Sequence, residues 1–398
     1  MKKFLAVCII CLLSILAVYY FWSNPQIMQN IFVPISDAVD SYMQEETPYT
    51  EDFIINDINI KSDNYYYNKL DKNHQAIYKS LANGVKELKS EFYIKDYKFV
   101  NTEKAMEDVE IAMESFLLDH PEVFYLADKY TVATSQNFLG DKLSLRVNYT
   151  VASMEELNSK IELIKSEIQK IINESNITTG NIFQNELNLH DTLGKRVGYC
   201  EYDNIQNIPH SAHTIYGAFV EKSAVCDGFS KALQILLDKA GIESIVITGS
   251  LDGEAHAWNM VKLDGSWYHV DITSNKSIND YPYVVVHAYF NVNNSEIQRT
   301  HLIDNMAQIP SATSEKYNYF VYLDKIIKNT DNFDTKLNQI LLNNQDKEKI
   351  EYKVLNVDEV PEKTIDILRN GKYYQYLDVT LTRFVYYNIL DNYVIIKR

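Results

Sequence analysis

The stretch AVCDGFSKALQILLDKAG, residues 224–241, decides the fold of this chain. After Cys226 the apolar residues recur at helical spacing, at Phe229, Ala232, Leu233, Leu236, Leu237 and Ala240. The pattern predicts a helix that begins at Cys226 and ends at Gly241, because glycine readily forms a left-handed C-cap. A sulfur at a helix N-terminus faces unpaired N–H groups and the positive end of the helix dipole, which favour the thiolate. We therefore expect Cys226 to be a nucleophile, with the same N–H groups able to stabilise an oxyanion.

A hairpin motif follows at residues 256–273, where HAWNMVKL and SWYHVDIT flank Asp-Gly. Asp-Gly between two strand-like runs is the strongest short-range signal for a β-hairpin. A two-residue turn pairs Trp258 with Asp271, which puts His256 and Asp271 on one face, about 7 Å apart at the backbone. A shift of one residue would put them on opposite faces, so the register tests this interpretation.

Cys226, His256 and Asp271 together have the chemistry of a catalytic triad. In such a set Cys226 attacks, His256 removes and later returns the proton, and Asp271 fixes the imidazole tautomer and steadies the cation. The alternative is that each residue is structural, with Cys226 in a disulfide with Cys200, which an oxidising compartment permits. The occurrence of all three at these spacings favours the triad. The negative charge of Asp227 opposes thiolate formation if its side chain points the same way as the sulfur.

Several motifs carry a family resemblance over residues 181–305. They are Leu189-His190-Asp191, Glu201-Tyr202-Asp203, Tyr216-Gly217-Ala218, Cys226-x-Gly228, Gly241-Ile242, His256-Ala257-Trp258-Asn259, Trp267 to Thr273, and Tyr289 to Val292 with His301. The segment resembles the transglutaminase-like superfamily, the circularly permuted relatives of papain-type thiol proteases. The resemblance implies the Cys–His–Asp assignment, a helix packed on an antiparallel sheet, and no cofactor. One departure is Asp227, where bacterial members often carry Gln or Glu.

Three residues are candidates for the substrate cleft around the triad. Trp258 is the candidate for a wall of the cleft, and Gly228 leaves room for a substrate backbone. Tyr216 would polarise the substrate carbonyl, although a place in the core is the stronger expectation. His269 lies two residues before Asp271 on the same strand, where packing support is a stronger expectation than catalysis.

Two classes of ligand are excluded by the sequence. The chain has 54 acidic and 38 basic side chains, and its net charge is −16, without the basic clusters that nucleic acid binding requires. His210 and His213 are close together, but no cysteine or carboxylate completes a ligand set at zinc-like spacing. We therefore expect neither a nucleic acid partner nor a metal.

The N-terminus predicts export. An apolar run from Phe4 to Phe21 follows Lys2-Lys3 and is near the lower limit for a membrane-crossing helix. It closes with aromatic residues, Tyr19 to Trp22, rather than a small-residue cleavage site, which favours an uncleaved anchor. The positive charge before the span puts the N-terminus in the cytoplasm. We expect a single-pass protein of the cell membrane, largely extracellular, with a protein or peptide substrate at the cell envelope.

The expected fold class is α+β, with a transglutaminase-like core and flanking α+β regions. We expect a signal-anchor at 1–24, a spacer at 25–50, an N-terminal α+β domain at 51–178, a catalytic domain at 181–305 and a C-terminal accessory domain at 310–398. In the first domain the periodicity predicts helices over about 70–88, 106–117 and from Ser153, and strands at 123–126, 130–134 and 142–149. In the last, it predicts helices near 334–342 and 363–369, a strand near 349–355 and a hairpin around Asp391-Asn392.

The leading hypothesis for function is thiol acyl chemistry outside the cell. Cys226 would attack a peptide or Gln side-chain amide, form a thioester and release an amine. Water as the acyl acceptor would make the protein a protease or deamidase, whereas a Lys amine would make it a crosslinking transglutaminase. The alternatives are a non-catalytic surface binding module that uses the same fold, and a pseudoenzyme that serves partner assembly.

Overall fold

The computed structural model describes residues 64–135, 142–202, 207–277, 285–304, 308–347, 349–370, 383–388 and 392–397. The predicted signal-anchor and spacer lie outside these residues. Among the helices of the described ranges, none is long and apolar enough to cross a membrane. The described parts of 50–177 and 182–398 belong to one compact unit. The boundaries between the domains expected at 51–178, 181–305 and 310–398 therefore stay predictions.

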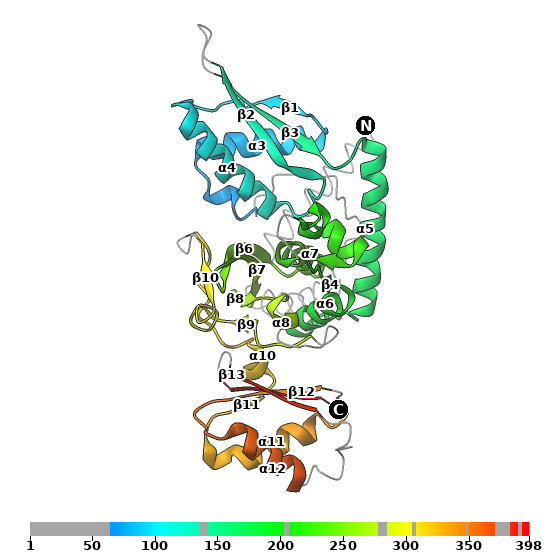
Figure 1. The fold of residues 1–398 in the computed structure, drawn as a ribbon, viewed down its shortest axis with the longest axis vertical. Coiled ribbons are helices and arrows are strands. Elements are labelled where there is room, and N and C mark those ends of the chain that lie inside the picture. The colour runs from blue at the N-terminus through cyan, green and yellow to red at the C-terminus, as the bar shows by residue number, and fades with distance from the viewer. Residues whose placement is uncertain are drawn as a thin grey trace, which may run out of the picture. The chain divides into compact units, whose positions relative to one another are not determined.

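The N-terminal part pairs two helices with an antiparallel sheet of order β1-β3-β2 (Figure 1). Its elements are α3 Lys72–Lys86, β1 Glu91–Tyr93, α4 Thr102–Asp119, β2 Leu126–Ser135 and β3 Lys142–Tyr149. Asp71 and Asn101 cap the two helices by accepting hydrogen bonds from backbone N–H groups of their first turns. The strand predicted at 123–126 is wrong except for Leu126, because the Val123 N–H bonds to the His120 carbonyl and closes a turn.

Two helices connect this part to the central sheet, α5 Met154–Glu174 and α6 Ile182–Arg196. Ser153 accepts from the Glu156 N–H at 3.2 Å, and the Glu156 carboxylate accepts from the Ala152 N–H at 2.8 Å. This is the predicted capping interaction, with its return bond one residue earlier than expected. The predicted apolar face of α5 is confirmed, since Ile161, Ile164, Ile168 and Ile172 are all buried.

The central sheet is antiparallel and has the order β10-β6-β7-β8-β9. Its strands are β6 Ser244–Leu251, β7 Glu254–Leu263, β8 Ser266–Val270, β9 Phe290–Val292 and β10 His301–Ile303. The helix α7, Cys226–Lys239, packs on β6 and β7 (Figure 1). The predicted hairpin register is confirmed from Leu263 opposite Ser266 to Asn259 opposite Val270. Asp264 and Gly265 both have positive φ, as a type I′ turn requires.

Short elements surround the central sheet. They are the parallel pair β4 Gly198–Tyr199 and β5 Ser223–Ala224, a π-helical turn at Gly217–Glu221, and the helices α8 Ser274–Ser277, α9 Asn294–Ile297 and α10 Tyr319–Tyr322. The predicted end of α7 is also confirmed, because Gly241 has φ +69° directly after the C-cap.

The C-terminal part is a four-stranded sheet of order β11-β12-β14-β13, with two helices against it (Figure 1). Its elements are β11 Ile326–Ile327, α11 Phe333–Asn343, β12 Lys349–Val354, α12 Val360–Asn370, β13 Arg383–Asn388 and β14 Asn392–Lys397. The predicted helices and strand of this part are confirmed within one to three residues. Asn388 pairs with Asn392, so β13 and β14 form the predicted hairpin, although Asp391 lies outside the described residues.

Candidate active site

Cys226 is the first residue of α7, and it is partly buried. The Val225 N–H donates to the Ala212 carbonyl at 3.0 Å, which fixes the backbone just before the cysteine. The close approach of the Ala212 carbonyl also requires a glycine at position 228, because a Cβ there would lie 2.2 Å from the Ala212 oxygen. The prediction that Gly228 leaves room for a substrate is therefore corrected: the space at Gly228 is filled by the chain's own backbone.

His256 and Asp271 lie next to each other, with His256 at the N-terminus of α7, where it contacts Cys226. The His256 Nε2 atom lies 2.8 Å from Asp271 Oδ2, and the two side chains are 10% and 1% exposed. Burial alone would lower the pKa of His256, but the charge of Asp271 and hydrogen bonds with Asp271 and Cys226 raise it to about 10. Because Nε2 faces Asp271, Nδ1 is the ring nitrogen that is available to Cys226.

Asp271 lies directly after β8 and caps the short helix α8. Its Oδ1 accepts from the Thr273 N–H and hydroxyl and from the Ser274 N–H, at 2.6 to 3.0 Å. Its Oδ2 accepts from the Ser274 hydroxyl as well as from His256. Burial would raise the pKa of Asp271, but the charge of His256 and hydrogen bonds from His256 and His301 hold it well below its usual range. Asp271 is therefore a carboxylate that can only accept hydrogen bonds.

His301 is a further member of the site that the sequence interpretation gave no role. Its Nε2 lies 3.0 Å from Asp271 Oδ2, and the residue is fully buried. The sequence marked His301 only as one of the motifs that carry the family resemblance. No spacing rule connects it with Asp271, because the contact depends on how β10 pairs with β6.

Trp258 packs next to His256, and His269 packs next to Trp258. Trp258 is fully buried, and its ring stacks on His256 with 5.9 Å between centroids. The prediction that Trp258 forms a cleft wall is therefore corrected, because it packs behind the histidine. His269 accepts from the Trp258 Nε1–H at 3.2 Å and donates to Asn294 Oδ1 at 2.9 Å. Burial lowers the pKa of His269 to about 4, so it is a neutral packing residue, as expected.

The charge of Asp227 is offset by its neighbours. Its carboxylate lies 3.0 Å from the His213 ring and 3.6 Å from the Lys231 amine. The hydrogen bond with Asp227 raises the pKa of His213. Asp227 also accepts from the Gly228 N–H. His210 pairs separately with Asp128 at 2.9 Å, so the two neighbouring histidines have different partners.

Tyr216 and Cys200 have their own surroundings. The Tyr216 ring stacks on Phe124 at 5.8 Å and lies beneath the Lys160 amine at 5.2 Å. Tyr216 is partly buried and packs against the edge of the core. Cys200 and Cys226 both carry free thiols, so the alternative of a disulfide between them is wrong for this structure.

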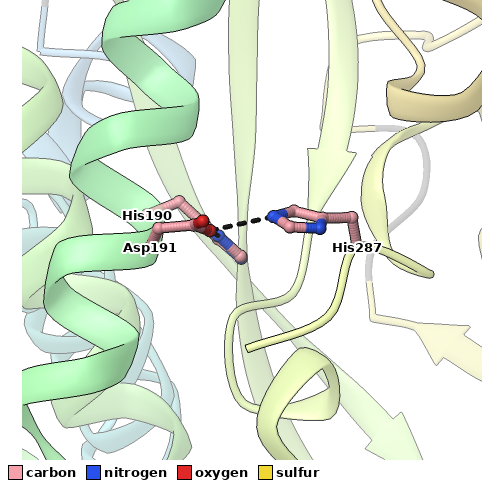
Figure 2. A group of neighbouring side chains, drawn as sticks. All are labelled: His190, Asp191 and His287. Carbon is pink, nitrogen blue, oxygen red and sulfur yellow. Dashed lines mark hydrogen bonds and ion pairs between the residues drawn. The ribbon is translucent and has the colours of Figure 1, made fainter. Parts of the chain in front are cut away.

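Two groups among the described residues bring three ligand-type atoms within 4.8 Å of one another. One is His256, Asp271 and His301. The other is His190, Asp191 and His287, in which one Asp191 oxygen contacts the rings of both histidines; its contact with His287 is marked in Figure 2.

Hydrogen bonds account for the second group without an ion. Asn275 Oδ1 accepts from the Tyr289 N–H, so its Nδ2 must be the donor to His190 Nε2 at 3.0 Å. Burial lowers the pKa of His190, and its one proton then lies on Nδ1, which donates to Asp191 at 3.0 Å. A metal at Nδ1 would require the proton on Nε2, facing the Asn275 donor. The donor pattern therefore does not fit a metal at His190.

His287 is held between two carboxylates. Its Nε2 lies 2.9 Å from Asp191, and its Nδ1 lies 2.6 Å from Glu351 on β12. Burial alone would lower the pKa of His287, but the charges of Glu351 and Asp191 raise it. Lys349 in turn pairs with Glu351. This buried ionic network connects α6, the segment before β9 and the C-terminal sheet.

The structure thus has a cysteine at the N-terminus of a helix and, hydrogen-bonded to it, a histidine on an antiparallel sheet. The family model described as the Transglutaminase-like superfamily matches residues 180–272, and this segment is transglutaminase-like. The match includes Cys226, His256 and Asp271.

Solved structures similar to the chain include a TGase, with 14% identity and a TM-score of 0.25, over 35% of this chain and 43% of that one. They also include the periplasmic domain of TgpA from Pseudomonas aeruginosa, with 11% identity and a TM-score of 0.22, over 37% and 65%. The chain thus covers less than two thirds of either relative. No curated protein matches the sequence.

Proposed function

We propose that the protein is a thiol enzyme that transfers acyl groups from peptide or Gln side-chain amides, with Cys226, His256 and Asp271 as its catalytic residues. The observation that carries the proposal is the 2.8 Å bond between His256 Nε2 and Asp271 Oδ2, which leaves Nδ1 for the cysteine. The raised pKa of His256, about 10, supports an imidazolium at neutral pH, the partner that a reactive thiolate needs.

The first half-reaction forms the thioester. The Cys226 sulfur attacks the amide carbonyl carbon, a C–S bond forms, and the carbonyl electron pair moves to the oxygen. Backbone N–H groups in the first turn of α7 stabilise this oxyanion. His256 Nδ1 gives its proton to the amide nitrogen, the C–N bond breaks, and the amine leaves.

The second half-reaction transfers the acyl group. Water or a Lys amine attacks the thioester carbonyl while His256 Nδ1 takes the proton of the nucleophile. The C–S bond then breaks and returns the thiolate beside the imidazolium. Asp271 stays ionised throughout, because its pKa is held well below the usual range, and its bond to Nε2 fixes the orientation of the ring.

We propose the cell envelope as the place of this reaction. The basis is the apolar run from Phe4 to Phe21 after Lys2-Lys3, which predicts an anchor with the enzyme outside the cell. The substrates would be proteins or peptides of the envelope. The acceptor, water or an amine, is decided by assays with a Gln peptide: ammonia release alone indicates deamidation, whereas incorporation of a fluorescent amine indicates crosslinking.

The test of the thiol chemistry is the rate of iodoacetamide labelling of the full-length protein between pH 5 and 9, with each modified cysteine mapped by mass spectrometry. We expect rapid labelling of Cys226 near pH 6 that is suppressed in His256→Ala. The matched control is His210→Ala, which removes a histidine that also has a carboxylate partner, Asp128. Labelling of Cys226 that does not depend on His256 would contradict the proposal and leave a binding module as the better hypothesis.

A further inference from the structure

Two imidazoles converge on one oxygen of Asp271. His256 Nε2 lies 2.8 Å from Oδ2, and His301 Nε2 lies 3.0 Å from the same atom. His301 is the first residue of β10, an edge strand that β6 and β7 separate from β8, the strand directly before Asp271. His256 is the only one of the two histidines that the catalytic proposal uses.

The donors and the acceptor in this contact can be assigned from the charge of Asp271. Asp271 is ionised and fully buried, so it can only accept, and both imidazoles must donate their Nε2 protons to it. Thr273 and Ser274 supply the donors to Oδ1, and the Ser274 hydroxyl is the third donor to Oδ2. Without His301, Oδ2 would be held by His256 and one hydroxyl that can rotate. The His301 imidazole therefore adds a second ring donor to Oδ2, which otherwise has His256 as its single ring donor.

Packing fixes the His301 ring in this orientation. Its centroid lies 4.9 Å from the ring of Trp258, 5.3 Å from Tyr289 and 5.5 Å from His256. On its other side Nδ1 lies 2.8 Å from the Thr300 hydroxyl, which can donate to it. Trp258 contacts both histidines, so the two rings share one aromatic support.

Resting on the proposed function, we propose that His301 is a positioning residue, which holds the Asp271 carboxylate so that His256 keeps its Nε2–H toward Asp271 and its Nδ1 toward Cys226. The donors from Thr273 and Ser274 hold Oδ1, so what His301 adds is a second ring donor on Oδ2, the oxygen that His256 contacts. Without it, Oδ2 and the His256 ring bonded to it could shift about the fixed Oδ1. His301 prevents this movement without contacting the substrate.

The test compares two variants of nearly equal size. His301→Gln keeps an N–H donor near the position of Nε2, whereas His301→Met removes the donor and keeps the volume. Iodoacetamide labelling of Cys226 in the full-length protein is followed from pH 4 to 8. In His301→Met we expect the pH of half-maximal labelling to rise by about one unit. At pH values below this midpoint, labelling should be about tenfold slower, because a His256 ring that is not held in place stabilises the Cys226 thiolate less. His301→Gln should stay within about twofold of the unchanged protein.

Other titratable groups near the two histidines do not produce this result. Burial raises the pKa of Tyr199 and Tyr289, and burial lowers the pKa of His269 to about 4, so none of them changes charge between pH 5 and 8. Equal labelling profiles for the Met and Gln variants would overturn the inference. If unchanged protein and His256→Ala label alike, the proposed function itself fails, whatever the His301 variants do.

A second measurement needs no folded variant. In the unchanged protein labelled with ¹⁵N-histidine, we expect His301 Nε2 to be protonated from pH 5 to 8 and His256 Nε2 likewise. An unprotonated Nε2 on His301 would contradict the donor role directly.

Discussion

Replacing Glu351 by Gln removes one charge from the buried network at His287. The two side chains are 0% and 3% exposed, and 2.6 Å separates Glu351 Oε2 from His287 Nδ1, so water screens the pair little. Two unit charges with centres about 4 Å apart attract by about 4 kcal/mol at an effective dielectric of about 20. Gln keeps a hydrogen-bond acceptor of the same shape, but it takes the charge of Glu351 away from Lys349 and leaves His287 with Asp191 as its carboxylate partner. We expect the free energy of unfolding to fall by about 3 kcal/mol at pH 6.

The pH dependence of this loss has a definite sign. The pKa of His287 is raised in the folded protein, so its ionic contribution is fully present below about pH 6.5 and is lost as the pH rises through the folded value. Burial would raise the pKa of Glu351, but the charges of Lys349 and His287 lower it to about 2, so its contribution is present above about pH 4.5 and is lost as the pH falls toward 2. The difference between variant and unchanged protein should therefore be largest between about pH 4.5 and 6.5.

Urea denaturation at pH 3, 6 and 9, followed by tryptophan fluorescence, measures the difference. The matched control is Glu91→Gln, which removes a carboxylate that pairs with Arg146 at 3.1 Å on the surface, where both side chains are largely exposed. Such a pair contributes about 0–1 kcal/mol, so the control should change little at any pH. A Glu351→Gln effect no larger than that of the control, or one that does not vary with pH, would refute the assignment of a charged His287.

Three further changes test the local structure. Gly228→Ala should destabilise the protein by about 1–3 kcal/mol in urea, because its Cβ would lie 2.2 Å from a carbonyl oxygen, whereas Gly198→Ala, with its nearest atom at 3.6 Å, should be tolerated. Ser153→Ala removes the N-cap of α5 and should cost about 1 kcal/mol by the same assay. In Asp271→Asn the pKa of His256 should fall from about 10 toward its ordinary value, as measured by NMR titration, because the charge of Asp271 is the largest cause that raises it. An unchanged pKa would contradict this account of the site.

The parts of the site that follow from local patterns could be predicted from the sequence. The helix after Cys226 depends on apolar spacing within fourteen residues, and the Asp-Gly turn fixes the register that brings His256 and Asp271 together. The turns and caps in these segments are local as well. For this reason the expected contact between the two side chains agrees with the observed hydrogen bond.

The parts that depend on tertiary approach could not be predicted. The sequence suggested that Gly228 leaves space for a substrate, but that space is occupied by the carbonyl of Ala212, which lies in a short 3-10 helix sixteen residues earlier in the chain. The alternation of side chains along β7 puts Trp258 on the same face as His256. That this face is closed to solvent at Trp258 follows only from tertiary packing, including the contact with His301 of β10. His301 lies thirty residues beyond Asp271, and no periodicity relates the two.

The C-terminal sheet, expected to be only an accessory, takes part in the structure around Asp271. Glu351 of this sheet binds His287, two residues before Tyr289, whose carbonyl accepts from the Asp271 N–H at 3.0 Å. Asn275 connects the same segments, because its N–H donates to the Asp271 carbonyl and its side chain accepts from the Tyr289 N–H. The backbone that presents Asp271 is therefore hydrogen-bonded to a segment that one buried ion pair attaches to β12. Loss of the pair between Glu351 and His287 should therefore shift the backbone at Asp271 more than it shifts Cys226. The position of Cys226 is fixed separately, by α7 and by the hydrogen bond between the Val225 N–H and the Ala212 carbonyl.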